Sequence, residues 1–442
     1  MNITEYLQSH PLLRLIAVLI TGIAVGYGMQ TPQFLLQHGI SVTTACCYAL
    51  LASLLISALL RRHCRVASIA LLSATFLLGI FLIKSERHTY TVPFAPQIEQ
   101  FMEESRAELS AIYQTQGLSD DEYAIVAAMT LGERQRVSTQ LREIYSITGA
   151  SHLFALSGLH LGIIYMMLTL LQPKLLLFKL RRLRRPLLML FVVLQIVTIW
   201  AYVLLVGCHA SLMRAAVMLT TYTIARQMSR HPENISVLAF TCALLLAIYP
   251  EWLFDVGFQM SFMAVLSITL LYIPLRNKLF TDPSALRPKF LQPLWKFFQT
   301  FFLQMLLLSF CAQIGVAPLI ALYFGRFSCY FLLTNLLVPI LTTLTIYLSL
   351  SILLFGLLST WMPTLCGSLL SWLVPCVIAC VKTFNGYLTG IASLPYSSID
   401  GIHINVIQTF LIYIIIFCSC MLAYHLHHGL RRRLNRVQAD NK

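Results

Sequence analysis

Charged residues are scarce in this sequence of 442 residues: only 11% are Asp, Glu, Lys or Arg, whereas 58% are hydrophobic. A soluble domain carries about 25% charged residues. The scarcity excludes an ordinary soluble enzyme or binding module. Apolar runs of helix-spanning length indicate an all-α polytopic membrane protein.

Paired cysteine motifs and nucleotide-binding motifs are also missing. The twelve cysteines include no C-x-x-C matched by a second one or by a histidine pair, which argues against a zinc site made of cysteines. The long polar segment 85–148 has no cysteine, so we predict no structural disulfide in it. No G-x-x-x-x-G-K-[ST] pattern occurs, so the sequence predicts no ATPase of its own and no cofactor.

The apolar runs predict about twelve transmembrane helices, some of them broken or re-entrant. The run at 329–358 is too long for one plain span, and the alternatives are a tilt, a break, or two short segments around Pro339. The runs lie at 11–28, 44–60, 67–83, 152–171, 187–206, 209–226, 235–249, 254–273, 299–321, 329–358, 364–384 and 405–424.

Lysine and arginine predict the orientation of these helices. Basic clusters recur in alternate connections, and the positive-inside rule assigns them to the cytoplasm together with both termini. The clusters are Arg61, Arg62 and Arg65, the segment 174–185, Arg226 and Arg230, the segment 276–296, and the tail 431–436. The segment 85–148, with ten acids and five bases, then lies outside, which in a bacterium is the periplasm.

The segment 85–148 is predicted to form a set of amphipathic helices. Apolar residues recur at helical spacing from Pro96 to Tyr113. The sequence Ser119-Asp-Asp-Glu122 is a capping box that starts a second helix ending near Gly132. A third short helix, ending before Gly149, places on one face Val137, Leu141 and Tyr145. We expect these helices to lie against the membrane or the bundle, and loose connecting helices are the alternative.

Polar residues interrupt the apolar region first in the stretch 148–165, TGASHLFALSGLHLGIIY. It contains His152, Ser157 and His160. Polar groups inside a bilayer are costly and mark function by default. The small residues Gly158 and Gly162 are candidates for close helix packing.

Two charged residues lie deeper in the apolar runs. We expect Arg214 and Asp255 to neutralise each other as an ion pair, which alternatively serves only to join two spans. Gln259 follows Asp255 by four residues on the same predicted helix face. Further polar residues in several runs are His209, Ser211, Ser261, Gln313 and Asn335. This scatter describes a lined path better than one compact reaction centre.

Two chemical alternatives were weighed against a path. Ser157, His160 and Asp255 are the residue types of a serine hydrolase, but the short Ser–His spacing and the missing strand-to-helix elbow argue against it. His152, His160, His209 and Asp255 are metal-ligand types without an H-E-x-x-H-like spacing. We therefore predict neither catalytic residues nor a metal site.

The connection between the runs at 254–273 and 299–321 is basic and aromatic. It reads FTDPSALRPKFLQPLWKFFQ, with Trp295 beside Lys296. Such a composition is typical of an interfacial aromatic belt. Stacking of nucleic-acid bases on these rings is the alternative.

Four segments match the signatures of one known family in order. They are SHLFALSGLHLGIIY, HASLMRAAVM, DVGFQMSFMAVLSI and AQIGVAPLIALYFGRFSCYFLLTNLLVPI. The chain thereby resembles the ComEC competence family, bacterial inner-membrane proteins for DNA internalisation. The matching signature positions are His152, Ser157, Gly158, His160, Arg214, Asp255, Gly257, Gln259, Ser261, Gln313 and Asn335.

The resemblance implies a channel that passes single-stranded DNA into the cytoplasm, with these polar and small residues as candidates for the path. It implies a channel domain at 149–426, preceded by a three-helix membrane region at 1–84 and the outer helices at 85–148, and followed by a basic cytoplasmic tail at 427–442. The implied partners are single-stranded DNA, membrane lipids, a separate periplasmic DNA-binding protein, a separate nuclease and a cytoplasmic ATPase motor, and an oligomer fits the family. A transporter or flippase of another anionic solute remains the alternative.

Two departures from long family members shape the expected activity. The segment between Glu86 and Pro96 is far too short for their OB-type domain. The H-x-H-x-D-H motif of their metallo-β-lactamase-like domain does not occur. We therefore expect no nuclease activity in this chain.

Overall fold

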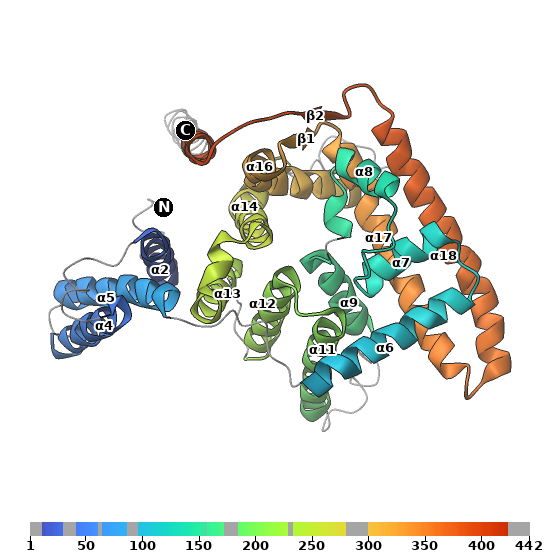
Figure 1. The fold of residues 1–442 in the computed structure, drawn as a ribbon, viewed down its shortest axis with the longest axis horizontal. Coiled ribbons are helices and arrows are strands. Elements are labelled where there is room, and N and C mark those ends of the chain that lie inside the picture. Colours follow the sequence, from blue (N-terminus) through green and yellow to red (C-terminus); the bar gives the residue numbers. More distant parts are fainter. Residues whose placement is uncertain are drawn as a thin grey trace, which may run out of the picture. The chain divides into compact units, whose positions relative to one another are not determined.

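The computed structural model describes residues 11–29, 41–60, 64–85, 96–154, 156–171, 184–228, 233–279 and 299–422. Helices make up nearly all of this chain, and a two-stranded ribbon completes it (Figure 1). The helices before the centre of the chain are α2 (Pro11–Gly28), α4 (Val42–Leu59), α5 (Cys64–Lys84), α6 (Pro96–Thr115), α7 (Asp120–Thr130), α8 (Thr139–Ile147), α9 (Gly158–Leu170), α11 (Arg184–Val206) and α12 (Ala210–Gln227). Those after it are α13 (Asn234–Ile248), α14 (Val256–Leu279), α16 (Gln304–Phe324), α17 (Phe331–Leu358), α18 (Pro363–Ala392) and a last helix, Val406–Leu422, with strands β1 (Arg326–Ser328) and β2 (Ser398–Asp400).

Each of the twelve predicted apolar runs falls on a helix, so the prediction of an all-α polytopic membrane protein is confirmed. Eight of the described helices are long and apolar enough to cross a membrane, and three more apolar helices are shorter. The number of actual crossings stays a prediction. The basic clusters at 174–183 and 280–296 and the tail 427–442 lie outside the described residues, as does the segment 86–95.

The described chain divides into two compact units. The first contains residues 1–142, 151–262 and 339–386, and the second contains residues 143–150, 263–338 and 387–442. The boundaries pass through α8, α14, α17 and α18. The N-terminal three helices therefore share a unit with the bundle, and the predicted boundary at residue 84 stays a prediction.

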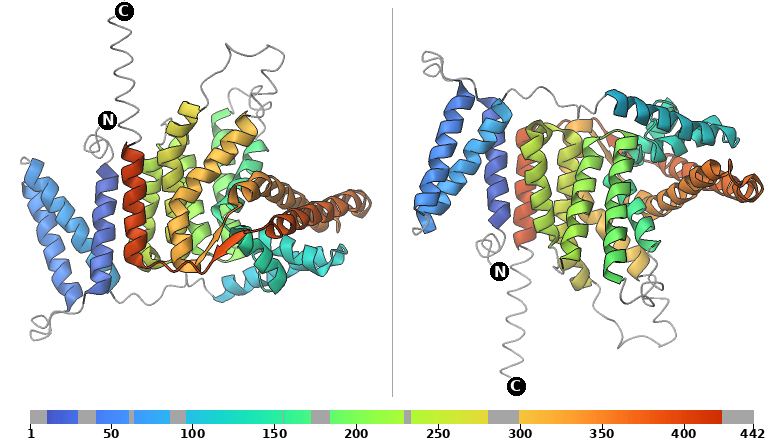
Figure 2. Two further views of the ribbon diagram at one scale, coloured as in Figure 1. Left: turned by 90° about the horizontal axis from the view of Figure 1, so that it is seen from above. Right: turned by 90° about the horizontal axis from the view of Figure 1, so that it is seen from below.

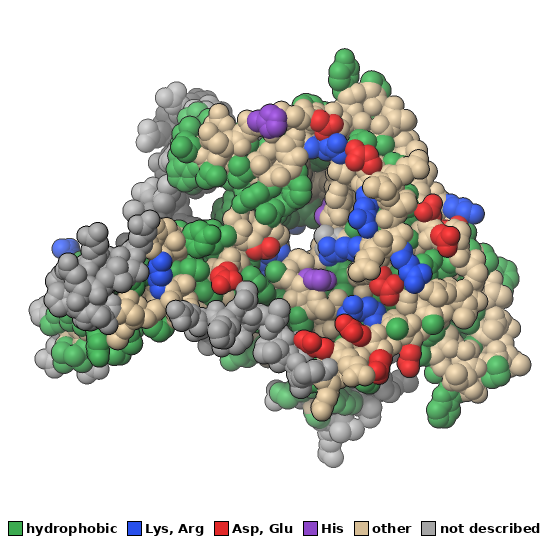
Figure 3. All heavy atoms as spheres, in the orientation of Figure 1, with side chains coloured by type: hydrophobic (Ala, Val, Ile, Leu, Met, Phe, Trp, Pro, Cys, Tyr) green, Lys and Arg blue, Asp and Glu red, His purple; other side chains and the backbone are tan. Residues whose placement is uncertain are grey.

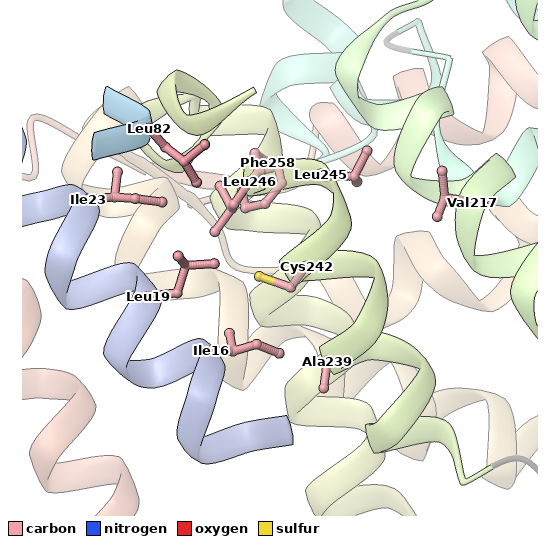
Figure 4. Close-up of a cluster of buried hydrophobic side chains, with 10 residues drawn as sticks. All are labelled: Ile16, Leu19, Ile23, Leu82, Val217, Ala239, Cys242, Leu245, Leu246 and Phe258. Carbon is pink, nitrogen blue, oxygen red and sulfur yellow. The ribbon is translucent and has the colours of Figure 1, made fainter. Parts of the chain in front are cut away.

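In the first unit, α2 joins the N-terminal helices to the bundle. Its apolar face, including Leu19 and Ile23, packs with Leu246 of α13 and Phe258 of α14 (Figure 4). On its other side α2 crosses α5 closely, because a Cβ atom on Gly79 would lie 2.6 Å from the Leu19 carbonyl oxygen. Small residues at such crossings let two helix backbones approach in a membrane.

The helices of segment 96–147 start and end where the sequence predicts. The Ser119 backbone N–H donates to Glu122 Oε2 at 2.8 Å, as the capping box predicts. Leu141 and Tyr145 of the predicted apolar face are buried on α8, and Val137, which lies just before that helix, is buried as well.

The amphipathic character of this segment differs between its helices. α7 is buried at every residue from Glu122 to Thr130, so it is not amphipathic as predicted, although it does lie against the bundle, one of the two expected positions. It is covered from several sides, because Tyr202 of α11 donates to the Thr130 carbonyl at 3.0 Å and Lys382 of α18 reaches Glu122 at 3.5 Å. A helix that is apolar all round is buried in this way. In α6, by contrast, Phe101 of the predicted apolar face is exposed.

Two helix directions cross in the first unit. Figure 1 shows α9, α11, α12 and α13 nearly end-on, whereas α6 and the paired α17 and α18 lie in the plane of the view, and Figure 2 agrees. We call α9, α11, α12 and α13 the central bundle, and α6, α7 and residues 339–386 the crosswise layer. α17 continues through Pro339 as one helix of 28 residues, so the alternative of two short segments is wrong.

The second unit is held together by an arginine in the β-ribbon. β1 pairs with β2 antiparallel, with Arg326 opposite Asp400. The Arg326 guanidinium binds the Asp400 carboxylate and donates to Glu143 Oε1 and Ser146 Oγ, both at 3.0 Å. Burial lowers the pKa of Arg326, but these carboxylates outweigh it and raise that pKa. Residues 143–150 are thereby fastened to the ribbon.

Candidate functional site

The stretch 148–165 is not one continuous helix. α8 ends at Ile147, Gly149 has a φ of +79°, and a short 3-10 turn covers Ser151–Leu153. α9 begins only at Gly158 and has 13 residues, fewer than the roughly 20 needed to cross a bilayer. The predicted start of this span at His152 is therefore wrong, and the histidine lies exposed before the helix.

Ser157 and His160 form the N-terminal cap of α9. The Ser157 backbone N–H donates to His160 Nδ1 at 3.1 Å, and the Leu159 N–H donates to Ser157 Oγ at 3.3 Å. This is a capping box in which histidine takes the place of the usual Glu or Gln. Because a backbone amide can only donate, Nδ1 is the acceptor and the ring proton sits on Nε2.

The His160 ring is fully buried, and its Nε2 atom has no hydrogen-bond partner among the described residues. A buried N–H donor without an acceptor is costly. The cap uses one ring nitrogen of His160, and the described residues offer no acceptor to the other.

The cap also bears on the hydrolase alternative. Ser157 Oγ does lie 3.2 Å from His160 Nδ1, which is within reach for a nucleophile and its base. The single lone pair of Nδ1 already accepts the Ser157 N–H, however, and Asp255 is engaged elsewhere. This arrangement favours a structural role for the pair. Over the described ranges, no group of three His, Cys, Asp or Glu side chains is arranged to hold a metal ion.

Arg214 and Asp255 interact electrostatically, as expected of the predicted pair, but no hydrogen bond joins them among the described residues. Asp255 Oδ1 accepts the backbone N–H of Phe258 at 2.6 Å and so caps the start of α14. A local donor three residues away therefore takes the carboxylate. As the cap, Asp255 lies just before α14, so it does not share a helix face with Gln259 as predicted. The Nε2 atom of Gln259 donates to the Leu253 carbonyl at 2.9 Å.

The Arg214 guanidinium is instead buried against aromatic rings. The side chain is 1% exposed, and its Cζ atom lies 5.3 Å from the centre of the Phe258 ring and 5.9 Å from that of Phe262. Within the described part of the chain, Nε, Nη1 and Nη2 all lack a hydrogen-bond acceptor. Cation–π contacts contribute about 2 kcal/mol when desolvated, which is less than the several kcal/mol that burial of an ion costs.

The remaining predicted residues are distributed over both units. In the first unit, a Cβ atom on Gly158 would lie 3.3 Å from that of Ala215, so Gly158 lets α9 and α12 pack closely. Gly162 faces open space, and its predicted packing role is wrong. Ser261 is half-buried on α14. Gln313 and Asn335 are half-buried in the second unit, on α16 and α17.

The structure adds basic residues that sequence reasoning passed over. Arg106 and Arg134 come from the net acidic segment 85–148, yet both interact electrostatically with His209 at the start of α12. They were missed because the charge was averaged over the whole segment. The sequence signal that could have found them is the local basic pair Arg134 and Arg136, which precedes the first matching motif.

Comparison with known proteins assigns the chain to a family. Residues 129–425 match the profile of the family described as Competence protein, which is more than half of the chain. The chain belongs to the competence-protein family. The resemblance to the ComEC family drawn from four motifs is thereby confirmed, and all candidate residues from His152 to Asn335 fall inside the matched range.

Two curated relatives of the family align over about half of this chain. ComE operon protein 3 of Bacillus subtilis (strain 168) is 29% identical over 226 residues, which cover 51% of this chain and 25% of that protein. An uncharacterised protein of Aquifex aeolicus (strain VF5) is 29% identical over 238 residues, covering 53% and 47%. The chain thus spans less than half the length of either relative. No solved structure matches.

Proposed function

We propose that this chain forms a membrane channel for uptake of single-stranded DNA in natural transformation. Membership of the competence family supports a role in DNA uptake, and the observation that carries the proposal is the buried guanidinium of Arg214, which has no hydrogen-bond acceptor among the described residues. A buried cation without an acceptor is expected at a functional site of a membrane protein. Each nucleotide of a strand brings one phosphate, the charge and the acceptor oxygens that Arg214 lacks.

The aromatic neighbours of Arg214 are suited to a DNA strand, as is its positive charge. The rings of Phe258 and Phe262 lie 4.4 Å apart between centres and offer apolar faces to bases. Because Arg214 is only 1% exposed, the path is closed at this point, and passage requires α12 and the start of α14 to separate. His160, Gln259 and Ser261 are further candidates for the path in the same unit.

The topology proposed from the basic connections places the channel in the bacterial inner membrane. Both termini lie in the cytoplasm, and α6, α7 and α8 lie on the periplasmic side. A separate periplasmic DNA-binding protein and nuclease deliver the strand, and a cytoplasmic ATPase drives its import. The chain itself transports and does not catalyse, which separates this proposal from the hydrolase alternative.

Transformation by externally added DNA tests the proposal. Deletion of the gene is expected to abolish transformants, and Arg214→Gln is expected to do the same while the protein remains inserted in the membrane. Arg226→Gln, an exposed arginine in the last turn of the same helix, is the matched control and should transform normally.

Normal transformation by the deletion strain would defeat the channel proposal. In that case, uptake of another labelled anionic solute distinguishes the transporter alternative. Loss of the Arg214→Gln protein from the membrane would show that the arginine joins helices and is not part of a path.

A further inference from the structure

Four chain segments converge at one end of the central bundle. After α7 the chain turns at Gly132, where φ is +79° and a Cβ atom would lie 2.7 Å from Leu156 Cδ1 and 2.9 Å from Val206 Cγ1. Ser211 Oγ, in the first turn of α12, donates to the Leu156 carbonyl at 2.8 Å. The turn after α7, the start of α9, the end of α11 and the start of α12 therefore meet there.

Basic side chains surround this meeting point. Arg106 of α6 donates from Nε and Nη2 to the Leu205 carbonyl, at 3.0 and 2.8 Å, and so sits beside the end of α11. Arg134 follows the Gly132 turn and interacts electrostatically with both His160 and His209. His152 is the other group that interacts with His160. We call Arg106, Arg134, His152, His160 and His209 the basic mouth.

Two hydrogen-bond donors of the basic mouth, on Arg134 and His160, have no partner among the described residues. The Nε atom of Arg134 is buried without a partner among the described residues, as is Nε2 of the fully buried His160. The side chain of His209 makes no capping hydrogen bond at the start of α12. The N-termini of α9 and α12 add partial positive charge at the same place.

The adjacent acid, Glu133, makes its hydrogen bonds to side chains outside the basic mouth. Glu133 Oε2 accepts hydrogen bonds from Tyr123 at 3.0 Å and from Ser110 at 3.2 Å, so it is held by α6 and α7. Figure 3 shows the face on which α6 and α7 lie, with Lys and Arg (blue) and His (purple) visible near its centre among acidic side chains. Unused donors from the turn after α7 and from α9, beside two helix N-termini, are the chemistry of a phosphate site.

We propose that the basic mouth binds a backbone phosphate of the strand before the strand reaches Arg214. The inference rests on the proposed channel function and assigns its first contact. Arg134 and the Nε2–H of His160 donate to the phosphate oxygens, while Arg106 and His209 contribute charge. On the proposed topology this site faces the periplasm.

Binding of labelled oligothymidylate by the full-length chain tests the site. The protein is placed in nanodiscs of neutral phosphatidylcholine, and fluorescence anisotropy is followed as salt is raised. Arg134→Gln is expected to weaken binding about 10-fold, because a hydrogen bond to a charged group is lost, and to reduce the log–log salt slope by about one unit. Arg136→Gln is the matched control, since Arg136 is exposed and rests on the Tyr123 ring.

Competition separates the sources of phosphate. Inorganic phosphate should displace the oligonucleotide only weakly, because it engages one site, whereas phosphatidylglycerol in the nanodisc should leave affinity unchanged. Strong inhibition by phosphatidylglycerol would overturn the proposal in favour of a lipid headgroup. Unchanged binding by both Arg134→Gln and His209→Gln would also overturn it, and the channel proposal would then still stand on the transformation result for Arg214→Gln.

Discussion

Two regions of the first unit treat buried charge in opposite ways. In the crosswise layer, Glu122 is nearly buried, accepts the Ser119 amide and is paired with Lys382. In the central bundle, Arg214 is more deeply buried and contacts aromatic rings, and the described part of the chain gives it no hydrogen-bond acceptor. Burial with a partner is what a structural charge requires, and burial without one is unfavourable unless a ligand supplies the missing atoms. On the proposed function, this contrast distinguishes a charge that stabilises the fold, Glu122, from a charge that binds an anion, Arg214.

The largest expected effect comes from exchanging a buried polar group in each region for an apolar one. Arg214→Met removes a buried charge that has no hydrogen-bond acceptor among the described residues, and it should leave thermal stability unchanged or raised, because burying such a group is costly. Tyr113→Phe in α6 should destabilise by about 1 kcal/mol, because its hydroxyl lies 3.1 Å from the Ser349 carbonyl in a fully buried site.

Thermal unfolding of the purified variants in detergent measures this contrast. Uptake assays complete it: Arg214→Met should lose transformation while Tyr113→Phe retains it. A marked loss of stability in Arg214→Met would break the comparison, since it would mean that the guanidinium has a structural partner.

His160 caps a helix through one ring nitrogen and has a donor without a partner among the described residues on the other. Two substitutions separate the roles of the two nitrogens. His160→Ala removes the cap of α9 and should destabilise by about 1 kcal/mol. His160→Gln preserves a capping box, because Gln at this position can accept the Ser157 amide. It should therefore keep the stability of the wild-type protein but lose the Nε2–H.

Stability by thermal unfolding and affinity for oligothymidylate, measured together, separate the two roles. We expect His160→Gln to be stable yet weaker in binding. Wild-type affinity in His160→Gln would assign the histidine to the cap alone and remove it from the basic mouth.

Local sequence patterns predicted the helices well because apolar runs and caps act within a few residues. Ser119 with Glu122 is such a case. The same logic applies at Asp255: its Oδ1 atom caps α14 through a donor three residues away, and this local role was missed because only the interaction with the remote Arg214 was considered. The burial of α7 could not be predicted either, because Tyr202 and Lys382, which cover it, are remote in sequence.

The site was predicted as a set of residue types and not as an arrangement. Arg214 was chosen correctly as unusual, but its aromatic surroundings depend on how α14 packs against α12. Arg134 was passed over because its segment is acidic overall, although charge acts over contact distances and not over segment averages.

The smallest expected effect concerns the paired side of the comparison, Glu122. Burial raises the pKa of its carboxyl, but the hydrogen bonds from Ser119 and the charge of Lys382 outweigh burial and hold that pKa below its ordinary value. A depressed folded-state pKa contributes stability above the unfolded pKa of about 4.3, and this contribution is lost as pH falls through the folded value. Thermal unfolding should therefore show that the wild-type protein loses stability between neutral and acidic pH. The loss should be smaller in Glu122→Gln. Asp120→Asn is the control, because Asp120 lies in the same first turn of α7 but is exposed. An identical pH profile for Glu122→Gln and the wild type would show that the Glu122–Lys382 pair does not stabilise the crosswise layer, and the contrast with Arg214 would then rest on burial alone.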